Sequence, residues 1–172
     1  MFAGKETITF NQYLYRRGYQ CMSAGEVMFR MIEKSFSEKS FRRFWRMWNP
    51  FTGYLFFLLY SFLVTNLRRP YSIFIVFLIS GMIFHDFLIF LFTGSVTIIF
   101  TITFVLYSFI FNTEEWMEAR RKKRSLHKKR TRSCPVYCFV LLNIALLSLP
   151  LCLGILVNYY VFPDSLINNL FR

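Results

Sequence analysis

The sequence predicts an all-α integral membrane protein that enters or crosses the bilayer several times. Hydrophobic residues make up 55% of the 172 residues and aromatic residues 21%, more than a soluble domain of this length can bury. Charged residues amount to only 17%, and they gather between the apolar segments. About four apolar segments follow one another along the chain, which is the pattern of a polytopic helical protein.

Composition divides the chain into four regions. Residues 1–35 carry mixed charge and no apolar core, so we expect a soluble or interfacial segment and no signal peptide. Residues 36–112 hold three of the apolar segments. We expect residues 113–136 to form a basic loop and residues 137–172 to form a last transmembrane helix with its tail.

An amphipathic helix is expected at residues 41–48, ahead of the first apolar segment. Aromatic residues recur there at three- and four-residue steps, and arginines take the other face: Phe41, Phe44, Trp45 and Trp48 against Arg42, Arg43 and Arg46. A basic helix with an aromatic stripe is suited to lie in the plane of the lipid headgroups. Pro50 then ends or redirects the helix.

The apolar segments differ in length. Residues 51–66 form a short one, because a hydrocarbon core about 30 Å thick needs about 20 helical residues. Residues 71–92 are long enough to cross. Residues 95–111 form the third segment, and residues 137–162 form the last.

The distribution of positive charge constrains the topology. The first 50 residues contain nine Lys and Arg, and residues 113–136 contain another nine. Cytoplasmic segments are enriched in these residues, so we expect both regions on the cytoplasmic side. An even number of full crossings must then lie between them. One of the three intervening segments is therefore expected to be re-entrant or incomplete, and the short 51–66 segment is the best candidate.

Charge and cysteine spacing also bear on partners and metals. The net charge of +12 comes from residues that flank apolar spans, which favours anionic lipid headgroups over nucleic acid as the partner. Cys134 lies in the basic loop and Cys138 just after it, without a second pair of Cys or His at ligand spacing. We therefore expect no metal site.

Two polar residues stand out against the apolar background. His85 lies inside the second apolar segment, where an ionisable side chain is costly and marks a candidate functional site. Asn49 lies at the mouth of the first segment, 36 residues earlier (85 minus 49). Taken alone, a histidine hydrogen-bonded inside a helix bundle and an asparagine that caps a helix remain alternatives.

Two motifs around these residues resemble a known family. Residues 40–50 read Ser-Phe-Arg-Arg-Phe-Trp-Arg-Met-Trp-Asn-Pro, and residues 81–86 read Gly-Met-Ile-Phe-His-Asp. The first is similar to the Phe-Trp-Arg-x-Trp-His/Asn element of membrane-bound O-acyltransferases (the MBOAT family). The second is similar to that family's Ser-Gly-x-x-His segment, which carries the catalytic histidine. The order and spacing of the two motifs carry the resemblance, which covers residues 40–111.

The resemblance implies transfer of an acyl group from a thioester donor, such as acyl-coenzyme A, to a hydroxyl of a polysaccharide, lipid or protein. The donor is a substrate, and no bound cofactor is expected. His85 would act as the general base and Asn49 as its polar partner. Trp45 and Trp48 would line a substrate channel, and Arg42 and Arg46 would meet phosphates.

The chain departs from the family in length, since family members have several hundred residues and many more spans. The resemblance is to their C-terminal catalytic portion. Three explanations stay open: a fragment, a subunit whose site a membrane-protein partner or a second copy of the chain completes, and a reduced relative that kept the motif but lost catalysis. The alternative is a non-enzymatic multi-pass subunit or scaffold of a larger complex. By analogy with compact family members, the expected location is a bacterial inner membrane.

Overall fold

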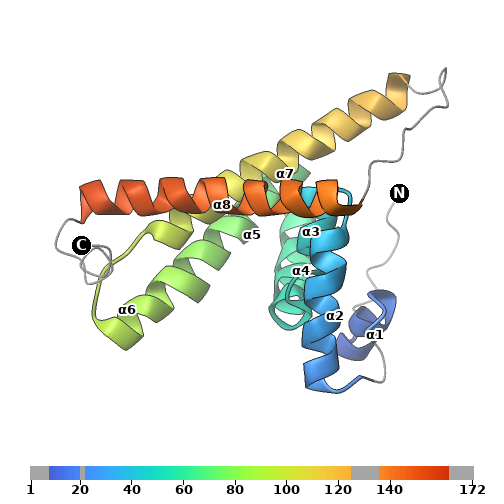
Figure 1. Cartoon of the computed structure of the whole chain (residues 1–172), viewed down its shortest axis with the longest axis horizontal. Helices are drawn as coiled ribbons and strands as arrows, with labels where there is room; N and C mark the ends of the chain where they lie inside the picture. The colour runs from blue at the N-terminus through green and yellow to red at the C-terminus, as the bar shows by residue number, and fades with distance from the viewer. Residues whose placement is uncertain (1–7, 20–21, 125–135, 163–172) are drawn as a thin grey trace.

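The structure, a computed structural model, describes residues 8–19, 22–124 and 136–162 (Figure 1). Within these ranges every regular element is helical, so the all-α prediction is confirmed. The elements in chain order are α1 (Phe10–Arg16), α2 (Ala24–Ser37), α3 (Phe41–Met47), α4 (Pro50–Asn66), α5 (Arg69–Gly81), the π-helix η1 (Met82–Asp86), α6 (Phe87–Thr93), α7 (Ile99–Arg124) and α8 (Val136–Val161).

Two stretches are long and apolar enough to cross a bilayer. One is the continuous run α5–η1–α6, with 25 residues, and the other is 24 residues of α8. The helices α3 and α4 pass the same test only as a pair, and the pair is bent by 110°. The described residues thus contain two candidate spans, or three with the bent pair, where the sequence predicted about four apolar segments. These apolar helices are consistent with an integral membrane protein.

The third predicted segment, residues 95–111, becomes the start of α7 and is not a candidate span. Its helical part reaches only from Ile99 to Phe111, about 20 Å at 1.5 Å per residue. The helix then continues as far as Arg124. The first part of the predicted 113–136 loop is therefore helical, and residues 125–135 lie outside the described ranges.

The junction of α3 and α4 explains their bend. Asn49 has a positive φ of 39°, the left-handed region that ends a right-handed helix. Pro50 follows as the first residue of α4, where its missing N–H costs nothing. The Asn49 side chain accepts a hydrogen bond from the Thr52 N–H at 3.3 Å and so caps the new helix.

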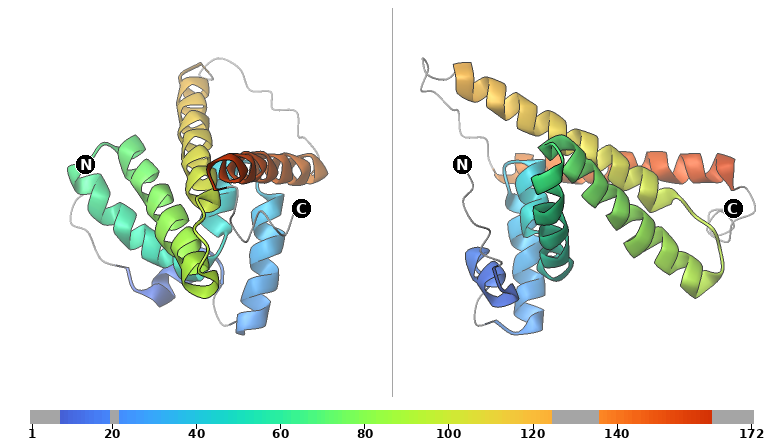
Figure 2. Two further views of the ribbon diagram at one scale, coloured as in Figure 1. Left: turned by 90° about the vertical axis from the view of Figure 1, so that its left-hand side faces the viewer. Right: turned by 180° about the vertical axis from the view of Figure 1, so that it is seen from behind.

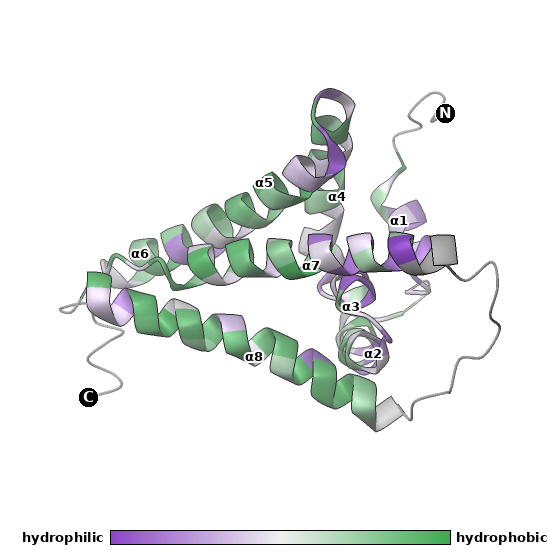
Figure 3. Cartoon of the chain, turned by 90° about the horizontal axis from the view of Figure 1, so that it is seen from above, coloured by the Kyte–Doolittle hydropathy of each residue, from purple (hydrophilic) through white to green (hydrophobic). Residues whose placement is uncertain are grey.

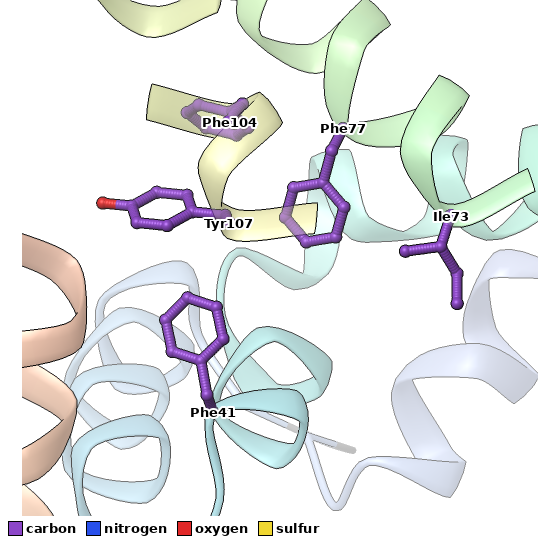
Figure 4. Close-up of a cluster of buried hydrophobic side chains, with 5 residues drawn as sticks. All are labelled: Phe41, Ile73, Phe77, Phe104 and Tyr107. Carbon is purple, nitrogen blue, oxygen red and sulfur yellow. The ribbon is translucent and has the colours of Figure 1, made fainter. Parts of the chain in front are cut away.

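The aromatic face of α3 is buried in the core instead of facing lipid headgroups. Phe41 and Phe44 are each only 1% exposed. Phe41 packs against Tyr107 of α7, whereas Phe44 packs against Phe36 of α2. The expected contact of this aromatic face with the headgroups is therefore wrong, while a position of the helix at the membrane surface stays a prediction. Figure 4 shows the core cluster, which consists of Phe41, Ile73, Phe77, Phe104 and Tyr107.

The N-terminus of α7 is held by side chains from neighbouring elements. Backbone N–H groups at a helix start have no partner within the helix and need one in apolar surroundings. The Asp86 carboxylate accepts from the Phe100 N–H at 3.0 Å and from the Thr101 N–H at 2.6 Å. Asn158 of α8 accepts from the Ile98 N–H at 3.1 Å. Polar residues inside apolar segments thus fix where α7 begins.

The helices cross at several angles and do not form a parallel bundle (Figures 1 and 2). α5 and α7 lie side by side, and α7 packs on α8. α2 stands across α8, where the Asn143 amide donates to the carbonyls of Phe36 and Glu38 at 3.1 and 2.9 Å. Figure 3 shows α8 hydrophobic along most of its length, whereas α7 becomes hydrophilic toward its C-terminal end.

Candidate functional site

One cavity of about 440 Å³ is lined by residues of α1, α3, α4, α5, η1 and α7 and of the junctions beside them. All six residues singled out from the sequence line it, although they come from two separate motifs: Arg42, Trp45, Arg46, Trp48, Asn49 and His85. The sequence did not identify several further lining residues, among them Tyr13, Arg17, Arg69 and Ser80. About half of the lining residues are aromatic, and the charged lining residues are arginines.

His85 lies in the π-helix η1, an irregularity that often marks functional sites. Its Nδ1 is 2.8 Å from the Ser80 carbonyl oxygen. A carbonyl only accepts, so this contact assigns the proton of the neutral ring to Nδ1 and leaves Nε2 to accept one. The ring packs against Phe100 and Phe104, with centroids 5.0 and 4.8 Å away. His85 is thus held in one orientation, with the proton arrangement of a general base.

Asp86, the residue after His85, does not orient the histidine through a hydrogen bond. Its carboxylate is buried and binds the backbone at the start of α7. The two adjacent polar residues therefore have separate tasks. Asp86 anchors α7 against η1, while His85 turns to the cavity.

Asn49 combines a structural bond with a donor for the cavity. Its Oδ1 caps α4 through the Thr52 N–H, and Met31 Sδ accepts from its backbone N–H at 3.1 Å. This use of Oδ1 leaves the Nδ2 amide protons to donate. No hydrogen bond joins Asn49 to His85 among the described residues, so a reacting group can meet both side chains only within the cavity.

The two tryptophans form part of an aromatic wall. Trp45 packs edge-on against Phe77 and lies 5.5 Å, centroid to centroid, from Phe104. Phe104 in turn contacts His85. Trp48 stacks on Phe44 at 5.4 Å. The wall thus runs from α3 to the histidine.

The arginines of the cavity divide into a paired and an unpaired set. Arg42 forms an ion pair with Glu118, and Arg69 Nε lies 3.0 Å from Glu115 Oε1. Arg17 and Arg46 have no acidic partner among the described residues. The expected role of Arg42 in binding phosphate is weakened, because Glu118 already neutralises its charge.

Tyr13 and Arg17 reach the cavity from α1, which the sequence assigned to a soluble or interfacial segment. They stand four residues apart on one helical face, and the Arg17 guanidinium lies 4.0 Å from the centre of the Tyr13 ring. Burial lowers the pKa of Arg17; the Tyr13 phenol opposes this shift, and the like charge of Arg46 adds to it. The spacing was visible in the sequence, but nothing local indicated that this face meets α3 and α4.

Metal ligands do not gather here. In the parts of the chain that the structure describes, no three His, Cys, Asp or Glu side chains are placed to hold an ion. Comparison with known proteins adds no assignment: no protein-family model, curated protein or solved structure matches this chain.

Proposed function

We propose that this chain is a membrane-bound O-acyltransferase-like protein that transfers an acyl group from a thioester donor to a hydroxyl. One observation carries the proposal. His85 and Asn49, which belong to motifs 36 residues apart in the sequence (85 minus 49), line the same cavity. A catalyst of this kind needs its base and its oxyanion donor around one space that admits substrate.

The proposed chemistry uses both residues directly. Nε2 of His85 takes the proton of the acceptor hydroxyl as its oxygen attacks the thioester carbonyl. The Asn49 amide donates a hydrogen bond to the oxyanion of the tetrahedral intermediate. The intermediate collapses, the carbon–sulfur bond breaks, and the imidazolium returns the proton to the leaving thiolate. The Ser80 carbonyl keeps the Nδ1 proton in place throughout.

The bent α3–α4 pair suits a re-entrant element that forms one side of the reaction chamber. Its 110° bend at Asn49 places the polar junction beside the cavity while α4 remains apolar. Non-regular backbone is tolerated in a bilayer where protein or a water-filled cavity covers it. The proposed setting is a bacterial inner membrane, with the N-terminus and the 113–136 region cytoplasmic.

A non-catalytic subunit or scaffold is the second candidate, and the surface of α8 favours it. Only 17% of the most apolar part of α8 is buried inside the protein. The remainder needs lipid or other helices as a covering. A membrane-protein partner or a second copy of the chain would satisfy this surface under either function.

Turnover by the purified chain in lipid vesicles tests the proposal, with acetyl- and long-chain acyl-coenzyme A as donors. We expect His85→Ala to lower the rate by about 10²–10⁴-fold. We expect Asn49→Asp to lower it by about 10²-fold while keeping the helix cap, because a carboxylate still accepts from Thr52 but cannot donate. Thiol release is the readout.

Thr93→Ala is the control, since Thr93 is exposed and does not line the cavity. Full turnover by His85→Ala would contradict the acyltransferase assignment. If neither the wild-type chain nor His85→Ala turns over the donor, co-purification from native membranes shows whether a partner protein is missing or the chain has a scaffold role.

A further inference from the structure

The cavity contains buried hydrogen-bond donors that no group in the described chain satisfies. We propose that Arg17, Arg46 and the Tyr13 hydroxyl form a binding site for a phosphate-class anion. This inference deepens the proposed function, and rests on it only in placing the anion on a ligand of the same cavity. It also makes α1 a part of the binding site.

The backbone after α1 is shaped to bring Arg17 to Arg46. α1 ends in a Schellman motif, in which the Tyr19 N–H donates to the Leu14 carbonyl at 3.1 Å and the Gly18 N–H to the Tyr15 carbonyl at 2.9 Å. Gly18 has a φ of +72°, the left-handed conformation that this motif requires. The turn directs the chain toward the C-terminal end of α3.

Two side chains then fix this turn in place. The Tyr19 hydroxyl donates to the Met47 carbonyl at 3.0 Å, one residue beyond Arg46. Lys34 Nζ donates to the carbonyls of Arg17 and Gly18 at 3.5 and 3.3 Å. The end of α1 is thus tied to α3 by Tyr19 and to α2 by Lys34, through bonds that do not involve the arginine side chains.

Electrostatics favour an anion at this end of the cavity. Glu118 and Glu115 neutralise Arg42 and Arg69, but no described acidic group faces Arg17 or Arg46. The partly buried Arg17 guanidinium feels the like charge of Arg46, and a bound negative charge would stabilise this pair of cations. Arg46 is exposed, so the cavity opens beside it, whereas Tyr13 is only 3% exposed.

All of the unsatisfied polar atoms that the described residues bring to the cavity lining can donate a hydrogen bond. The buried atoms without a hydrogen-bond partner that belong to lining residues are Tyr13 Oη, Arg42 Nε and Trp45 Nε1. Arg42 Nε and Trp45 Nε1 can only donate, and burial raises the pKa of Tyr13 to about 12, so its hydroxyl keeps its proton at neutral pH. Buried donors are costly to leave unpaired. A ligand rich in acceptor oxygens, such as a phosphate, can accept hydrogen bonds from these donors.

Binding in nanodiscs tests the site without requiring turnover. The full chain in phosphatidylcholine is titrated with coenzyme A and with pantetheine, which lacks phosphate groups. A second arm measures retention of phosphatidylglycerol by native mass spectrometry, which distinguishes a lipid headgroup from a soluble phosphate. We expect a preference for the phosphate-bearing ligand of about tenfold or more in one of the two arms.

Matched variants assign that preference to the site. The double variant Arg17→Gln with Arg46→Gln should abolish it, and Tyr13→Phe should weaken binding by about threefold to tenfold. The control Arg16→Gln with Arg43→Gln removes the same charge from exposed arginines outside the cavity and should retain it. Helical circular dichroism checks that each variant is folded.

Three outcomes would overturn the inference: no preference in either arm, an unchanged preference in the folded Arg17/Arg46 double variant, or an equal loss in the control. The proposed function is judged separately, because His85→Ala should bind the anion normally while losing turnover. Arginine-dependent binding by a wild-type chain that turns over no thioester would uphold the site, and co-purification from native membranes would then separate a missing partner from a scaffold role.

Discussion

At the level of single residues, His85 and Asn49 each use one polar atom to hold the fold and line the cavity with the rest of the side chain. The Ser80 carbonyl holds Nδ1 of His85, and Thr52 occupies Oδ1 of Asn49. The structural alternatives for these residues, a histidine hydrogen-bonded inside the fold and a helix cap, are thus both observed, and each residue also lines the cavity. Variants that separate the two roles, such as Asn49→Asp, are more informative than simple truncations.

Tyr13 gives the chain a dependence of stability on alkaline pH. Burial raises its pKa to about 12, and Arg17 partly opposes the shift. An unfolded tyrosine ionises near pH 10, so the unfolded state loses its proton first. The stabilisation from this shift is complete below about pH 10 and is lost as the pH rises to about 12, and it amounts to about 2–3 kcal/mol.

We therefore expect Tyr13→Phe to lose less unfolding free energy than wild type between pH 9.5 and pH 11.5. Denaturant unfolding in detergent, followed by circular dichroism, measures the difference. The control Tyr15→Phe changes a ring that is 65% exposed and should behave as wild type. Equal alkaline losses in wild type and Tyr13→Phe would contradict the prediction.

At the level of elements, the contact between α5 and the start of α7 positions the histidine. Gly81 ends α5 immediately before η1 and lets the two backbones approach closely. The same contact brings Asp86 within hydrogen-bond distance of Phe100 and Thr101. Gly81, four residues before His85, therefore allows the close packing of α5 on α7, and the position of the His85 ring against Phe100 depends on that packing.

Gly81→Ala is expected to destabilise the protein by about 1–3 kcal/mol through overpacking. An added Cβ would lie 2.5 Å from the Phe100 carbonyl oxygen and 2.8 Å from Thr101 Cα, both of which are backbone atoms. Gly25→Ala is the matched control, because its Cβ meets nothing within 4 Å and an exposed helical position gains about 0.5–1 kcal/mol. Thermal unfolding of both variants measures the difference. Equal stability of Gly81→Ala and Gly25→Ala would contradict the prediction.

At the level of the whole molecule, ion pairs bring two distant basic regions to one end. Arg42 at the start of α3 pairs with Glu118, and Arg69 at the start of α5 pairs with Glu115. Both glutamates lie in the hydrophilic part of α7 that leads toward the basic 125–135 segment (Figure 3). The location of the N-terminal region and the 113–136 region on one side of the membrane stays a prediction.

Cysteine accessibility in sealed vesicles tests this topology. In a cysteine-free background, we expect Arg43→Cys and Ala119→Cys to react with an impermeant maleimide from the same side, because both positions are exposed near that end. Phe92→Cys, at the far end of α5–η1–α6, should not react from that side. Labelling of positions 43 and 119 from opposite sides would contradict the arrangement.

Local patterns were sufficient for the helical class, the apolar segments and the two motifs. Helix periodicity, caps and the cost of polar groups in lipid all act over a few residues, so they are visible in the sequence. The same reasoning failed for the aromatic face of α3, which it assigned to the headgroups. Whether such a face meets lipid or protein depends on what packs against it, and Phe77 and Phe104 lie far along the chain.

Which residues line the cavity was likewise decided by the tertiary structure. The sequence alone determined a helical membrane protein with His85 and Asn49 as candidate site residues. Only the fold paired Arg42 with Glu118, and it gave Arg17 and Arg46 no acidic partner within the described residues, through contacts between residues far apart in the chain. Ion pairs and shared cavities depend on distances in space, and packing of several helices at once sets those distances.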